Sequence, residues 1–126
     1  MLADSKAFSG FAVDDLDKAQ RFYGETLGLK TELLDEEHGL LTLHLAGDRD
    51  TLIYRSPGFT PASYTMLNFP VDDIDRAVEG LGARGVSFER YEGMPQDEKG
   101  VMREGGPLIA WFKDPAGNTL SVLQER

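Results

Sequence analysis

The sequence predicts an α+β fold of two βαβββ modules, with mixed curved sheets, helices on the outer faces and a concave inner pocket. The main observation is a repeat. FAVDDLDKA at 11–19 returns as FPVDDIDRA at 69–77, an offset of 69 − 11 = 58 residues, with six of nine positions identical. Each copy reads as strand, helix and glycine, and β-like runs follow it. An internal repeat of this kind indicates a duplicated structural unit.

Each copy of the phrase predicts a strand that runs into a capped helix. Apolar and small residues alternate at 11–13, as in a strand with one buried face. Asp14 and Asp72 are the expected N-caps, because aspartate there accepts hydrogen bonds from the first free amides of a helix. Gly28 and Gly85 stand where a left-handed residue would end each helix. Capping accounts for the paired aspartates without a metal or acid–base role.

Three strands are expected after each helix. They are 29–35, 40–46 and 51–56 in the first module, and 86–92, 108–114 and 119–125 in the second. We therefore expect a single domain over 1–126, built from repeats at about 7–56 and 65–125 with a linker at about 57–64. The long connection at 92–107 is either a flap over one end of a pocket or a variable loop.

Charge and composition limit the classes of partner. The chain has 126 residues, 22 acids against 13 bases, a net charge of −9 and no cysteine. An acidic surface without a basic cluster disfavours nucleic acid and anionic membranes. No apolar run is long enough to span a membrane, and the first residues do not resemble a signal peptide. We expect a cytoplasmic protein whose partner is a small molecule.

Two segments carry a family resemblance. VDDLDKAQRFYGETLGL at 13–29 and WFKDPAGNTLSVLQ at 111–124 are similar to the first module and the closing hairpin of the vicinal oxygen chelate superfamily. That superfamily includes glyoxalases, extradiol dioxygenases, fosfomycin-resistance enzymes and bleomycin-resistance proteins. The resemblance covers about 7–125 and implies the same paired-module fold. It does not choose among the activities, because one fold hosts many chemistries.

The resemblance also implies four ligands around one divalent metal. Carried over by motif, these positions fall on Phe8, Ile53, Met66 and Ser121. Transition metals prefer imidazole, carboxylate and thiolate groups, and none of the four residues offers one. We therefore expect no metal and no other cofactor.

The two histidines offer a weaker alternative. His38 lies in an acidic turn and is expected to be solvated, and His44 alternates with leucines in a strand and is expected to make an ordinary hydrogen bond. A single imidazole near carboxylates could still bind a metal weakly or act as a base.

Strand alternation predicts which side chains line the pocket. With Phe8 and Met66 facing inward, the same inner face receives Gly10, Ala12, Thr51, Ile53, Arg55, Asn68, Pro70, Thr119, Ser121 and Leu123. Trp111 is either an inner-face aromatic residue or core packing. The predicted ligand-binding residues are Phe8, Ile53, Met66, Asn68, Trp111 and Ser121. Such a lining favours an apolar or aromatic organic ligand.

The sequence is compatible with three functions. The first is a metal-independent binding protein of the glyoxalase/bleomycin-resistance fold that sequesters or carries an organic ligand. The second is an enzyme of the superfamily, a glyoxalase-like lyase or ring-cleaving dioxygenase, with an unrecognised or non-metal active site. The third is an interaction subunit with a vestigial pocket. A homodimer is expected in each case, because two-fold assemblies are the commonest oligomers.

Overall fold

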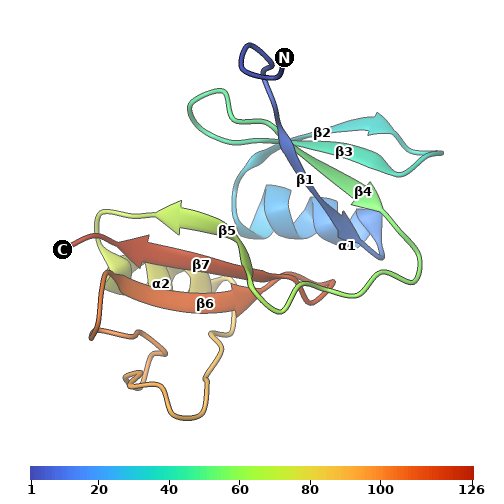
Figure 1. Ribbon diagram of the computed structural model, residues 1–126. Helices are drawn as coiled ribbons and strands as arrows, with labels where there is room; N and C mark the ends of the chain where they lie inside the picture. Colours follow the sequence, from blue (N-terminus) through green and yellow to red (C-terminus); the bar gives the residue numbers. More distant parts are fainter. The chain divides into compact units, whose positions relative to one another are not determined.

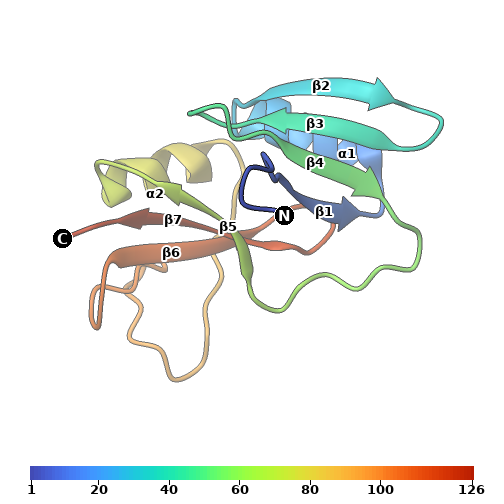
Figure 2. The ribbon, with the colours of Figure 1, turned by 45° about the horizontal axis from the view of Figure 1, so that its top comes forward.

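The computed structural model describes all residues, 1–126, and they divide into two compact units at 1–60 and 61–126. This division falls inside the expected linker. Each unit is a mixed sheet with one helix packed on it, as Figures 1 and 2 show. The α+β fold of two modules is therefore confirmed, and neither sheet closes into a barrel. No helix is long and apolar enough to cross a membrane.

The first unit contains four strands and one helical segment. In chain order the elements are β1 (Ser9–Val13), α1 (Leu16–Arg21), η1 (Phe22–Thr26), β2 (Lys30–Asp35), β3 (Leu40–His44) and β4 (Thr51–Arg55). The sheet order is β1-β4-β3-β2, with β1 parallel to β4 and the other pairs antiparallel. All three strands expected after the first helix are present.

Both helices begin one residue later than predicted. The N-caps are Asp15 and Asp73, not Asp14 and Asp72. Asp15 Oδ1 accepts a hydrogen bond from the Lys18 amide at 3.1 Å, and Asp73 repeats this contact in the second unit. The physical reason is geometric, because an N-cap side chain reaches the amide three residues ahead and needs an extended backbone, which the second aspartate of each pair adopts.

The first helix changes its geometry before it ends. After Arg21 the chain widens into the π-helical turn η1, in which the Leu27 amide donates to the Phe22 carbonyl at 2.9 Å. Gly28 follows with φ 73°, the left-handed conformation expected of a residue that ends a helix. The π turn extends the helical segment and carries Tyr23 into the core.

The core of the first unit lies between α1 and one face of the sheet. The residues there with no exposed surface are Tyr23, Leu41, Leu43 and Ile53. The Tyr23 ring contacts the Phe11 ring at a centroid distance of 5.6 Å. Strand register pairs Ile53 with both Phe11 and Leu41, so these residues share the face that α1 covers.

The second unit has three strands. Its elements are β5 (Thr65–Pro70), α2 (Ile74–Ala83), β6 (Leu108–Lys113) and β7 (Thr119–Gln124). The sheet order is β5-β7-β6, with β5 parallel to β7 and β6 antiparallel to it. The Gln124 side chain accepts from the Ile74 amide at 2.9 Å and so joins β7 to the start of α2.

The strand expected at 86–92 does not form. Only Phe88 makes a bridge, to Phe112, and the Glu89 amide donates to the Trp111 carbonyl at 2.8 Å. The Gln96 side chain forms hydrogen bonds with the neighbouring backbone groups instead. Its amide nitrogen donates to the Glu89 carbonyl, and its oxygen accepts from the Tyr91 amide. A side-chain amide thus replaces the partner strand that a ladder would need.

The connection 92–107 is fastened by Asp97 and Arg103. Asp97 Oδ1 accepts from the Lys99 and Val101 amides, and Asp97 Oδ2 accepts from Arg103 Nε at 2.9 Å. Arg103 also donates to Asp75 on α2 at 2.5 Å. Burial tends to raise the pKa of Asp97, but these hydrogen bonds outweigh it and lower the pKa below its usual value of 3.8. The loop is tied to the helix of its own unit.

Candidate functional site

Three of the predicted ligand-binding residues lie in one row across the second sheet. Register pairs Asn68 with Ser121 and Ser121 with Trp111. The Ser121 hydroxyl donates to Asn68 Oδ1 at 2.6 Å. Gln124 points to α2, and side chains alternate along a strand, so Ser121 and its row neighbours face away from that helix.

Tyr91 adds a second aromatic ring to this row. Its ring meets that of Trp111 edge to face, with a centroid distance of 5.5 Å and an interplanar angle of 78°. Burial and the neighbouring Glu89 carboxylate both raise the pKa of Tyr91, so its hydroxyl stays protonated at neutral pH. Tyr91 was not among the predicted ligand-binding residues. The sequence did contain a signal for Tyr91. It lies two residues after Glu89, and in an extended chain this spacing places both side chains on the same face, the one that carries Trp111.

The row combines an aromatic pair with neutral polar groups. Ser121 is fully buried and uses its proton on Asn68, whereas Asn68 is exposed and its amide nitrogen makes no hydrogen bond within the protein. An exposed amide donor beside an aromatic pair suits a flat organic molecule with a hydrogen-bond acceptor. The residues of this row, Asn68, Ser121, Trp111 and Tyr91, are called the aromatic row below.

Met66 lies next to the aromatic row but outside its regular pairing. The register between β5 and β7 shifts between Thr65 and Leu67, so Met66 is the extra residue of a β-bulge. It is half-buried and two residues from Asn68.

The predicted inner-face residues of the first unit are placed differently. Ile53 was expected on the face of Gly10 and Ala12, and this is wrong, because Ile53 pairs with Phe11 and is fully buried on the α1 side. Thr51 and Arg55 share its face by alternation and are misplaced in the same way.

The cause of this error is a shift of one residue between the two modules. Gly10 and Asn68 hold the same place in the repeat, since 68 − 10 = 58. Gly10 pairs with Leu52, and Asn68 pairs with Ser121. Leu52, not Ile53, is therefore the counterpart of Ser121. Phe8 precedes β1 and is 70% exposed.

The residues at the metal positions do not fit a metal. With the register corrected, the positions carried over from the family hold Phe8, Leu52, Met66 and Ser121, among which are one hydroxyl and one thioether. Elsewhere, no group of three or more His, Cys, Asp or Glu side chains is arranged to hold an ion. This donor set lacks the imidazole and carboxylate ligands that zinc, nickel, iron and manganese prefer.

Both histidines contact carboxylates. His44 Nδ1 lies 2.8 Å from Asp50 Oδ1, while its Nε2 is buried without a hydrogen bond, 3.7 Å from Glu32 Oε1. His38 Nδ1 lies 2.6 Å from Asp35 Oδ2, and hydrogen bonds from the His38 ring and amide lower the pKa of Asp35. An imidazole oriented by a carboxylate has the geometry of a general base, and His44 is the histidine whose second ring nitrogen is buried without a hydrogen bond.

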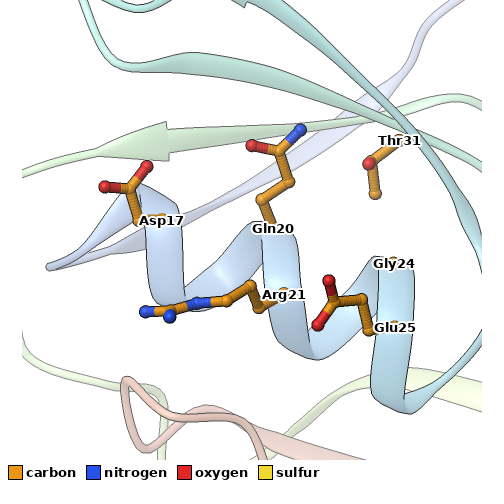
Figure 3. Close-up of a pocket in the computed structure, with 6 residues that line it drawn as sticks. All are labelled: Asp17, Gln20, Arg21, Gly24, Glu25 and Thr31. Atoms are coloured by element: carbon orange, nitrogen blue, oxygen red, sulfur yellow. The ribbon is translucent and has the colours of Figure 1, made fainter.

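The structure also has a polar pocket that the sequence did not indicate. It lies in the first unit against α1, η1 and β2 and measures about 500 Å³. Figure 3 shows the residues that line it, Asp17, Gln20, Arg21, Gly24, Glu25 and Thr31. Helical periodicity alone does not reveal it, because the π turn changes which side chains of this segment lie together.

Comparisons with known proteins agree with this fold. The family model described as "Glyoxalase/Bleomycin resistance protein/Dioxygenase superfamily" matches residues 7–122. The curated relative lactoylglutathione lyase GLX1 of Arabidopsis thaliana is 25% identical over 125 residues, which cover 90% of this chain. The chain spans only 42% of that relative's length.

Two solved structures are similar over nearly the whole chain. An antibiotic-binding protein from a Streptomyces strain is 26% identical with a TM-score of 0.69, and the match covers 98% of both chains. The fosfomycin resistance protein FosX of Listeria monocytogenes has a TM-score of 0.72 at 15% identity, covering 98% of this chain and 92% of that one. At this identity FosX supports the fold alone.

Proposed function

The chain belongs to the glyoxalase/bleomycin resistance protein/dioxygenase superfamily, and we propose that it is a metal-independent binding protein that sequesters or carries an apolar or aromatic organic molecule. The observation that carries the proposal is the aromatic row. Its edge-to-face ring pair provides apolar contact area, and the exposed Asn68 amide provides a directional donor. These features suit recognition of a flat ring system with a polar substituent.

Two further observations support the proposal, one on the absence of a metal and one on ligand binding. The metal positions of the family hold residues that bind transition metals poorly. A structural relative of 26% identity is described as an antibiotic-binding protein. We propose that the ligand contacts Asn68, Trp111 and Tyr91, with Met66 beside them, and that the buried Ser121 orients the Asn68 side chain through its hydrogen bond.

Trp111 makes the test direct, because it is the only tryptophan of the chain. Titration with acridone, a neutral planar ketone whose carbonyl accepts hydrogen bonds, should quench the Trp111 fluorescence to saturation. Tyr91→Ala should weaken binding roughly three- to tenfold, the range expected for losing one aromatic contact. Tyr64→Ala is the matched control, since Tyr64 is 71% exposed in the same unit and lies outside the row. Unsaturable quenching, or equal weakening by both variants, would contradict the proposal.

An enzyme is the second candidate, favoured by the lyase relative and by the contact of His44 with Asp50. In that case the chain would form or break down S-lactoylglutathione, and His44→Gln would abolish the activity. The binding proposal expects no formation or breakdown of S-lactoylglutathione and no effect of His44→Gln on the acridone titration.

We further propose that the protein works as a cytoplasmic homodimer. The absence of cysteine in the sequence is compatible with a reducing compartment, and two-fold assemblies are the most frequent oligomers. Light scattering should give twice the mass of the chain at micromolar concentration. The monomer mass would contradict the dimer and leave the ligand proposal intact.

A further inference from the structure

We propose that the polar pocket of the first unit binds a free α-amino acid with a polar side chain. Its volume of about 500 Å³ is in the range of small-molecule sites. Its lining comes from α1, η1 and β2 of the first unit, whereas the aromatic row belongs to the second unit. The proposal is independent of the function argued above.

The pocket offers charges of both signs that are not paired with each other. Asp17 and Glu25 are acidic and Arg21 is basic, at a spacing of four residues on either side. Such neighbours normally form ion pairs on an α-helix. Here Arg21 makes no ion pair with either. The turn that follows Arg21 is π-helical, which breaks the regular spacing between Arg21 and Glu25. The three charges are left available to a ligand.

This charge pattern selects the class of ligand. A simple anion would meet two carboxylates and the net charge of −9, and a simple cation would meet the Arg21 guanidinium. A zwitterion satisfies both. Its carboxylate would pair with Arg21, which binds carboxylates through two parallel hydrogen bonds, and its ammonium would pair with Asp17 or Glu25. Figure 3 shows Arg21 and Glu25 extended in the same direction along the helix.

Two neutral groups complete the pocket. The Gln20 amide and the Thr31 hydroxyl each donate and accept hydrogen bonds, and Thr31 comes from β2 and not from the helix. These groups match a hydroxyl or amide on the ligand side chain. Serine is therefore a suitable probe.

Gly24 is the residue that keeps Thr31 accessible. A Cβ at position 24 would lie 3.5 Å from the Thr31 hydroxyl oxygen, an ordinary contact that would occupy the space in front of it. The backbone does not require glycine, because Gly24 is not among the residues with positive φ. Glycine destabilises a helix relative to alanine, so no local reason for its presence is apparent. Keeping the pocket open in front of Thr31 is a reason for glycine at this position.

The test uses the full chain and follows the backbone amide signals of Gly24 and Thr31 by NMR during titration with L-serine to about 10 mM, a range suited to weak binding. Three ligands test the contributions of the carboxylate and the ammonium of the amino acid separately. L-Serine should shift these signals saturably, whereas L-serinamide, which lacks the carboxylate, and N-acetyl-L-serine, which lacks the ammonium, should bind at least tenfold more weakly.

Variants separate the pocket from the rest of the helix. Arg21→Gln should weaken L-serine binding about tenfold, a typical loss for one charged contact. Lys18→Gln removes the same charge from an exposed residue outside the pocket and should change nothing. Gly24→Ala should raise the melting temperature and still reduce binding, which a loss of folding cannot explain.

Three results would overturn the proposal. One is the absence of saturable shifts with L-serine. Another is equal binding of L-serine and L-serinamide, which would assign the pocket to simple amines. The last is full binding by Gly24→Ala. None of these results bears on the Trp111 titration, so the two sites are tested separately.

Discussion

The two units start from the same phrase and diverge after their helices. Asp15 and Asp73 make the same capping bond at the same distance, and Gly28 and Gly85 both adopt positive φ after the helices. Beyond that point the first unit continues into β2, whereas the second forms a hydrogen-bonded loop. Capping residues therefore set how each repeat begins, while individual polar side chains decide how it continues.

The sheet faces turned away from the helices differ in the same way. At the equivalent positions the first unit pairs Gly10 with Leu52, and the second pairs Asn68 with Ser121. A side chain at Gly10 would be crowded, because a Cβ there would lie 3.1 Å from the Leu52 carbonyl oxygen. Only the second unit thus carries directional hydrogen-bonding groups on this row, which is why we propose the ligand site there.

The largest expected difference between the units concerns their helix-borne core residues. Tyr23 and Leu81 hold equivalent positions, since 81 − 23 = 58, but Tyr23 is fully buried and Leu81 only half-buried. Tyr23→Ala should lower the free energy of unfolding by about 3–5 kcal/mol, and Leu81→Ala by less than about 2 kcal/mol. Urea unfolding of both variants measures this. Equal losses would show that the two helices pack alike.

The capping aspartates should give smaller and equal effects. Asp15→Ala and Asp73→Ala should each lower the free energy of unfolding by about 0.5–2 kcal/mol, since each leaves a helix amide without its acceptor. Asp14→Ala and Asp72→Ala are matched controls with the same charge change and should be nearly neutral. If the controls were the destabilising pair, the assigned helix starts would be wrong by one residue.

The loop that distinguishes the second unit should loosen without its arginine. Arg103→Gln removes the contacts to Asp75 and Asp97 and should speed hydrogen exchange at the Val101 amide, which donates to Asp97 at 2.9 Å. Arg76→Gln, an exposed change on α2 with the same loss of charge, should not. Unchanged exchange in Arg103→Gln would mean that the loop is held by its backbone alone.

Acid should loosen this loop as well. The pKa of Asp97 is lowered in the folded protein, so its contribution is fully present above the unfolded value of 3.8 and is lost as the pH falls through the folded pKa. The Lys99 and Val101 amide signals should therefore shift together only below pH 3.8. A midpoint above that value would contradict the assigned hydrogen bonds.

Sequence reasoning predicted the fold because the repeat, the turns and the helix ends are local signals. Asn68, Trp111 and Ser121 came together because strand alternation and register fix them. Ile53 was misplaced because the two modules differ by one residue in strand register. The strand pairing shows this difference, whereas the sequence similarity that aligns Thr51 with Thr119 hides it. The polar pocket depends on a π turn, for which the sequence carries no reliable pattern.

The central claim is that this chain binds an organic ligand at the aromatic row without a metal. The most direct measurement is the titration of Trp111 fluorescence with acridone before and after treatment with a chelator, with elemental analysis of the same protein. We predict the same saturable quenching in both samples and no stoichiometric metal. Stoichiometric zinc, nickel, iron or manganese, together with loss of quenching on chelation, would contradict the account.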